Sequence, residues 1–105
     1  MATAYLREYA DIAHTFSKVA QAGAEPAIAD QTITTSGTSA ASSAFNANTR
    51  LIAISTPAAQ AVCALFSATR GATPTALVTS LRLPANNVFF FGVNPGDKVA
   101  LIDVT

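Results

Sequence analysis

The chain has 105 residues, and its six basic residues balance six acidic ones, so that the formal net charge at pH 7 is zero. A neutral chain has no net field to draw it toward nucleic acid or toward an anionic membrane surface. Charged residues make up only 11% of the chain, against roughly 25% in an average soluble domain. We therefore expect one domain with a small core and an easily desolvated surface, with no nucleic-acid partner and no membrane partner.

The N-terminal part, residues 5–22, spaces its large apolar side chains three or four positions apart, which is typical of an amphipathic helix. The same segment equally suits an extended arm that covers a neighbouring subunit. Residues 21–30 have too little apolar bulk for a core element. We therefore predict an N-terminal arm or short helix plus an extended segment over residues 1–30 and a β domain over residues 31–105. The β domain is expected to fold without the arm.

The N-terminal residues also bear on localisation. Arg7, Glu8 and Asp11 interrupt them, so they lack the apolar stretch of a signal peptide. The longest apolar run, residues 58–68, is far shorter than the roughly 20 residues that span a bilayer. We expect a soluble product that is made in a cytoplasm.

From residue 31 onward, short β-prone runs alternate with turn residues, as in an antiparallel sandwich. We predict strands at Thr32–Thr35, Arg50–Ser55, Val78–Leu83, Val88–Val93 and Lys98–Val104. The last two flank Asn94-Pro95-Gly96-Asp97, where Pro fixes φ at the second turn position and Gly tolerates a positive φ at the third. This turn predicts a hairpin. The expected fold class is mainly β, a small antiparallel sandwich or jelly-roll-like domain.

Residues 57–70 allow two interpretations. Thr56 as N-cap, Pro57 at the first helical position and Gly71 at the end fit a helix with an Ala-rich interior. The same stretch contains Val62–Phe66, which is short enough for a buried strand. The β-rich neighbourhood slightly favours the strand.

The residues that usually carry chemistry are sparse. His14 is the only histidine, Cys63 the only cysteine, and the carboxylates are scattered singly. General acid–base catalysis, nucleophilic catalysis and metal binding each need several such groups together. The Pro95-Gly96-Asp97 turn lacks the further glycines of a phosphate-binding loop. We therefore expect no enzyme, and no catalytic, cofactor-binding or metal-binding residues.

The triple aromatic Phe89-Phe90-Phe91 is the most informative feature. Side chains alternate across a strand, so Phe90 must face away from the other two, and at least one face must be shielded. The shield is either the N-terminal segment or another subunit, since exposed apolar patches mark interfaces. As candidate interface residues we predict Tyr5, Leu6, Tyr9, Ile12, Phe16, Phe89 and Phe91.

Four segments carry a resemblance to a known group of proteins. They are YLREYADIA at residues 5–13, VAQAGAEPAIADQTIT at 19–34, SAFNANTRLIAI at 43–54 and LPANNVFFFGVNPGDKVALID at 83–103. Together they resemble small virion proteins of tailed bacteriophages, of the capsid decoration or cement type. The resemblance implies a structural protein of the virion that binds and stabilises the shell of the major capsid protein, with copies of itself or other lattice neighbours as partners.

Two alternatives remain open at this stage. Another virion component, such as a head–tail connector or a tail protein, would share all of these features, and the number of copies per particle would separate it from a capsid protein. A small ligand-binding β module, for example for carbohydrate, would be favoured by an exposed aromatic platform.

Overall fold

The computed structural model describes residues 2–14, 19–23 and 27–104, with the backbone alone for residues 12–14 and 19–23. This part of the chain contains ten strands and no helix. The strands are β1 (Ala2–Tyr9), β2 (Ile12–His14), β3 (Val19–Gly23), β4 (Ala29–Thr35), β5 (Ala40–Ala41), β6 (Leu51–Ser55), β7 (Val62–Phe66), β8 (Leu81–Leu83), β9 (Val88–Gly92) and β10 (Val99–Asp103).

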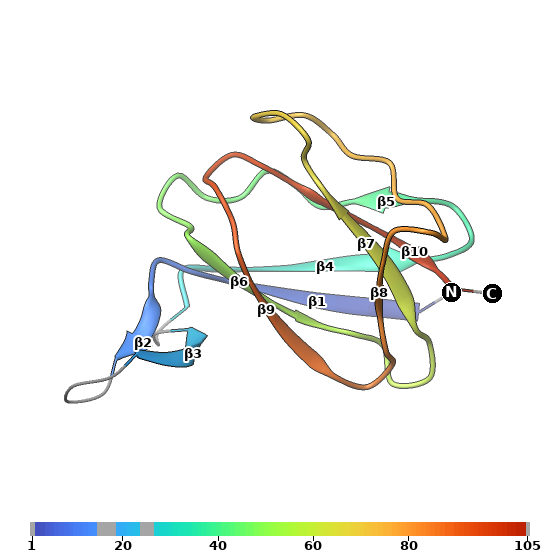
Figure 1. Ribbon diagram of the computed structural model, residues 1–105, viewed down its shortest axis with the longest axis horizontal. Coiled ribbons are helices and arrows are strands. Elements are labelled where there is room, and N and C mark those ends of the chain that lie inside the picture. The colour runs from blue at the N-terminus through green and yellow to red at the C-terminus, as the bar shows by residue number, and fades with distance from the viewer. Residues whose placement is uncertain (1, 15–18, 24–26, 105) are drawn as a thin grey trace.

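Eight of these strands form a sandwich of two antiparallel sheets, in the orders β4-β1-β6-β9 and β5-β10-β7-β8 (Figure 1). The remaining two, β2 and β3, pair only with each other and form a hairpin that extends from one end of the sandwich (Figure 1). The chain crosses repeatedly between the two sheets after β4, as it does in jelly rolls. The predicted mainly β, antiparallel sandwich is confirmed.

The N-terminal segment differs from the prediction. β1 lies between β4 and β6, with Tyr5 opposite Thr32 on one side and Ser55 on the other. The helix predicted for residues 5–22 is wrong where the structure describes that segment, since it consists of β1, β2 and β3; residues 15–18 lie outside the description. The sandwich therefore begins with β1 and not at residue 31, and this strand is no detachable arm.

The predicted turn at Asn94–Asp97 is present, but the predicted hairpin is wrong. The amide of Asp97 donates to the Asn94 carbonyl at 3.3 Å, and Gly96 has a φ of 82°. However, β9 pairs with β6, and β10 pairs with β7 and β5. The turn residues Asp97 and Gly96 exchange backbone hydrogen bonds with Phe45. The turn therefore carries the chain from one sheet to the other.

The remaining strand predictions agree with the structure apart from their ends. Residues 62–66 form β7, which confirms the strand and rules out the helix over that segment. The strand predicted from Val78 shortens to β8, because the amide of Ser80 donates to the Leu77 carbonyl and closes a turn before it.

The core lies between the two sheets and consists mainly of aliphatic side chains. Its largest buried members are Leu6, Ile33, Phe45, Ile52, Ile54, Val62, Leu83, Val99 and Leu101. Phe66 and Phe91 join the two sheets through rings whose centroids are 5.1 Å apart. The far side of the second sheet is also covered, because Ala76 packs over Cys63 and Ile102. The first sheet therefore keeps an open outer face, while the outer face of the second is covered around Ala76 and open at Leu65.

Glu8 is a buried carboxylate on the inner side of β1. Its Oε1 accepts hydrogen bonds from the Asn46 amide at 2.7 Å and from the Thr49 hydroxyl at 2.8 Å. Its Oε2 accepts one from Gln31 Nε2 at 3.0 Å. The carboxylate thus ties β1 to β4 and to the segment that leads into β6, and it holds β1 in register.

Replacing Glu8 with Ala should lower the free energy of unfolding by about 3 kcal/mol, because buried donors of Asn46 and Thr49 lose their acceptor. The control is Asp30→Ala, which breaks an exposed ion pair with Arg7 and should remove less than about 1 kcal/mol. Urea denaturation followed by circular dichroism measures both values. Equal losses in the two variants would contradict this role of Glu8.

Candidate functional site

The outer face of the sheet β4-β1-β6-β9 is built from two rows of side chains that cross all four strands. Strand register places Thr32, Tyr5, Ser55 and Val88 in one row, here called the Tyr5 row. The second row, here called the Arg7 row, contains Asp30, Arg7, Ala53 and Phe90. Side chains two positions apart share one face of a strand, so the two rows lie next to each other.

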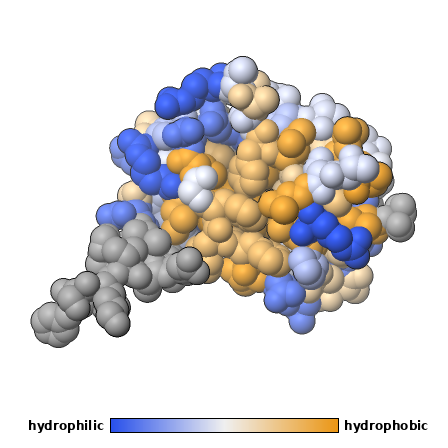
Figure 2. Space-filling model, viewed as in Figure 1, coloured by the Kyte–Doolittle hydropathy of each residue, from blue (hydrophilic) through white to orange (hydrophobic). Residues whose placement is uncertain are grey.

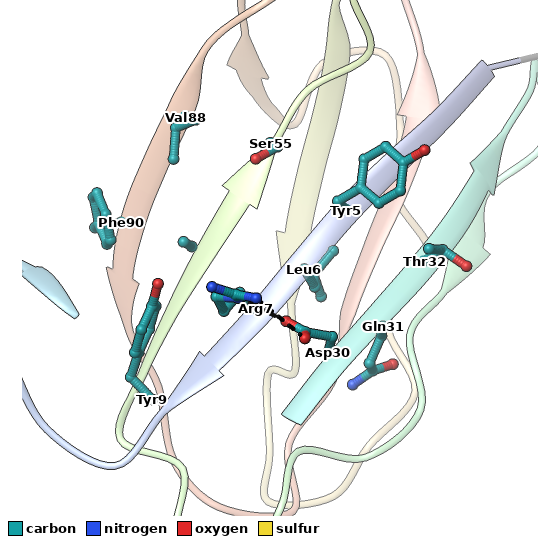
Figure 3. Close-up of a pocket in the computed structure, with 11 residues that line it drawn as sticks. Tyr5, Leu6, Arg7, Tyr9, Asp30, Gln31, Thr32, Ser55, Val88 and Phe90 are labelled. Atoms are coloured by element: carbon teal, nitrogen blue, oxygen red, sulfur yellow. Dashed lines mark hydrogen bonds and ion pairs between the residues drawn. The ribbon is translucent and has the colours of Figure 1, made fainter. Parts of the chain in front are cut away.

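A hollow of about 610 Å³ lies over these rows. The β6 residues at its centre, Ala53 and Ser55, have small side chains, and the larger side chains of the neighbouring strands surround them. Figure 3 shows Tyr5 on one side of the hollow and Tyr9 and Phe90 on the other. The site is therefore a shallow depression with aromatic rings at its sides.

The rings and aliphatic groups around the hollow are largely open to solvent. Tyr5 is 58% exposed, and Val88 and Phe90 are also exposed. Tyr9 is buried, with its ring centroid 6.5 Å from that of Phe90. Figure 2 shows apolar surface across the middle of the molecule, along β9. Such a patch on a small domain is a candidate interaction surface.

The polar groups of the hollow are arranged around one ion pair. Arg7 Nε donates to Asp30 Oδ1 at 2.9 Å and Nη2 donates to Oδ2 at 3.4 Å, between residues that face each other on β1 and β4 (Figure 3). Both side chains are about half exposed. The opposite charges balance, so this face can be covered by a partner without leaving a net charge in the contact.

The structure separates the predicted interface residues into three groups. Tyr5 is on the outer face and exposed, and Tyr9 is on the same face but buried. Leu6 is buried in the core, and Phe89 and Phe91 are half-buried against it. The side chains of Ile12 and Phe16 lie outside the description.

Phe90 faces the side opposite to Phe89 and Phe91, as predicted. The more exposed face of β9 is therefore the one that carries Phe90. Sequence reasoning also missed Arg7, Asp30 and Val88. Side chains alternate between the two faces of a strand, so a strand predicted over residues 2–9 would have placed Arg7 on the same face as Tyr5.

The described residues also limit what chemistry the site can perform. Among them, no three His, Cys, Asp or Glu side chains lie close enough together to hold a metal ion. Cys63 is a free, buried thiol. The described part of the chain contains no helix that could span a membrane.

We compared the chain with protein-family models, curated proteins and solved structures, and none of the three comparisons found a match.

Replacing a Phe side chain of β9 with Ala should change the free energy of unfolding by different amounts on the two faces of the strand. Phe91→Ala should lower the free energy of unfolding by about 3 kcal/mol, because the ring packs against Phe66 in the core. Phe90→Ala should remove about 1 kcal/mol, because the ring is 38% exposed and its described ring contact is with Tyr9. Thermal and urea unfolding would test this difference, and a larger loss for Phe90→Ala would refute the assignment of the faces.

Proposed function

We propose that this protein is a structural virion protein, a capsid decoration or cement protein that binds and stabilises the major capsid protein shell of a tailed phage. The proposal combines the resemblance of four sequence segments with one structural observation. That observation is the open outer face of the first sheet, with exposed Tyr5, Val88 and Phe90 around the hollow.

The composition of this face suits a protein partner. Interfaces are enriched in aromatic residues and Arg, and large rings that enter a partner's pocket supply much of the binding energy. Tyr5 offers such a ring, and Arg7 with Asp30 supplies balanced polar contacts beside it. The shell is therefore expected to contact the Tyr5 and Arg7 rows. On the second sheet, Ala76 packs against Cys63 and Ile102, but Leu65 on the same outer side is exposed.

Tyr5→Ala should weaken binding to bare shells of the major capsid protein at least about tenfold, which corresponds to roughly 1.4 kcal/mol. The fold should persist, since the Tyr5 ring is exposed. The measurement is a sedimentation assay of the purified protein with shells from the phage that encodes it, over a range of protein concentrations.

The matched control is Leu77→Ala. Leu77 is 59% exposed, as Tyr5 is 58% exposed, but it belongs to the segment between β7 and β8 of the other sheet. This variant should bind shells as the wild type does. Absence of wild-type binding would refute the capsid proposal, and equal effects of the two substitutions would refute the assigned face.

A head–tail connector or a tail component would use the same face in the same way. Counting copies per particle by quantitative mass spectrometry separates these positions in the virion. Hundreds of copies are expected for a capsid protein, and a few copies would place the protein in the neck or the tail.

The hollow supports a second candidate, a small ligand-binding β module for carbohydrate. Tyr5 and Phe90 are accessible rings, and the polar groups of Asp30 and Thr32 line the same depression. Small-molecule sites combine a concave, largely apolar surface with a few polar groups that orient the ligand. The exposed aromatic platform is the feature that favours this alternative.

A glycan array followed by calorimetric titration tests the second candidate. A carbohydrate module should bind a defined glycan, and Tyr5→Ala should abolish that binding while Leu77→Ala leaves it unchanged. A protein that binds shells but no glycan in the array would exclude this alternative.

A further inference from the structure

The hollow on the outer face exists because the strand beneath it, β6, carries small side chains there. Ala53 and Ser55 form the floor, while the neighbouring strands β1 and β9 carry larger residues at most of the paired positions. Ser55 lies between Tyr5 and Val88, and Ala53 occupies the same central position in the Arg7 row. The hollow therefore runs along β6, with β1 on one side and β9 on the other (Figure 3).

One end of the hollow is closed by two aromatic rings. The next row along the same three strands consists of Tyr9, Leu51 and Gly92. The Tyr9 ring reaches across β6 toward β9, where its centroid lies 6.5 Å from that of Phe90. At the opposite end of the hollow Tyr5 is exposed. An occupant therefore enters beside Tyr5 and meets Tyr9 and Phe90 at the inner end.

The width of the hollow favours a single side chain over a helix. Neighbouring strands of a sheet are about 4.8 Å apart, so the backbones of β1 and β9 are about 10 Å apart across β6. The side chains of Tyr5 and Val88 occupy part of this distance. An α-helix with its side chains is about 10–12 Å wide, so it would rest on these side chains without reaching Ala53. One ring that projects from an extended segment can reach the floor.

The charges of the hollow favour an uncharged occupant. Among the described residues that line it, the charged ones are Arg7 and Asp30, which bond to each other at 2.9 Å. A charged group that entered the hollow would lose its water without gaining an unpaired counter-charge. A neutral ring has no such cost, and it gains contact with the rings of Tyr5, Tyr9 and Phe90. Charge balance and the surrounding rings thus favour the same chemistry.

We propose that the hollow binds one aromatic side chain of the major capsid protein, presented by an extended segment of the shell. The inference rests on the proposed function and adds the chemistry of the partner to it. The incoming ring packs on Ala53 between Tyr5 and Phe90. Aromatic pairs favour centroid distances of roughly 4.5–7 Å, and the pair of Tyr9 and Phe90 already lies in this range.

Filling the hollow tests the inference without removing any of the rings around it. Ser55→Leu places an aliphatic side chain on the floor, so binding to bare shells should weaken at least about tenfold. The matched control is Thr34→Leu, which adds the same side chain to the same outer face, on β4 and outside the hollow. This variant should bind shells as the wild type does. Urea denaturation checks that both variants fold.

A small probe tests the chemistry of the occupant without shells. N-acetyltryptophanamide, titrated into the wild-type protein through the millimolar range, should shift the amide resonances of Ala53 and Ser55 in nuclear magnetic resonance spectra. The charged analogue N-acetyllysinamide should leave these resonances unchanged. A methyl glucoside should also leave them unchanged, and Ser55→Leu should abolish the shifts that the tryptophan probe causes.

Two outcomes would overturn the inference while the capsid proposal stands. The first is equal shell binding by Ser55→Leu and Thr34→Leu. The second is shell binding by the wild type without any effect of the tryptophan probe on Ala53 and Ser55. Shifts caused by the glucoside and not by the tryptophan probe would overturn it in favour of a carbohydrate site. A wild type that binds the tryptophan probe but no shells would refute the capsid proposal, and with it the partner named here.

Discussion

The register of β1 is the constraint on which the open face depends, and the Glu8 carboxylate holds it. A buried carboxylate is strongly destabilising unless donors replace its water, and here Asn46, Thr49 and Gln31 do so. A shift of β1 by one residue would break these bonds and exchange the two faces of the strand. Tyr5 would then enter the core, and Leu6 would point to solvent.

The two sheets differ in how much of their outer side is covered. Both faces of β10 are buried, since Val99 and Leu101 point into the core while Ala100 and Ile102 lie beneath the segment that contains Ala76. The sheet with β1 carries the hollow and its surrounding rings on its outer side, and β3 also contacts its strands β6 and β9.

Local patterns predicted most of the strands, because apolar runs bounded by turn residues suffice to place β4, β6, β7, β9 and β10. They also predicted that Phe90 faces away from its neighbours. They failed for β1, since Tyr5, Leu6 and Tyr9 are large residues on both faces of a strand and their spacing imitates that of a helix. They failed again at Asn94–Asp97, because a turn has the same local geometry whether its strands pair or separate. Here β9 pairs with β6, and β10 pairs with β7 and β5, which are partners that the local pattern of the turn does not reveal.

The pairing of distant strands has a consequence for the time course of folding. β1 bonds β6 through Tyr5 and Ser55, and β10 bonds β5 through Ala100 and Ala41, so neither sheet can form from adjacent segments alone. Strands that pair across such long loops lose chain entropy before their contacts form. This slows folding into the range of milliseconds to seconds, as in other all-β sandwiches. During synthesis β1 and β4 can pair first, but the apolar side of that ribbon stays uncovered until β6 and the opposite sheet have emerged. The interval between translation and closure of the sandwich is therefore the period in which the chain is most open to aggregation and to chaperones.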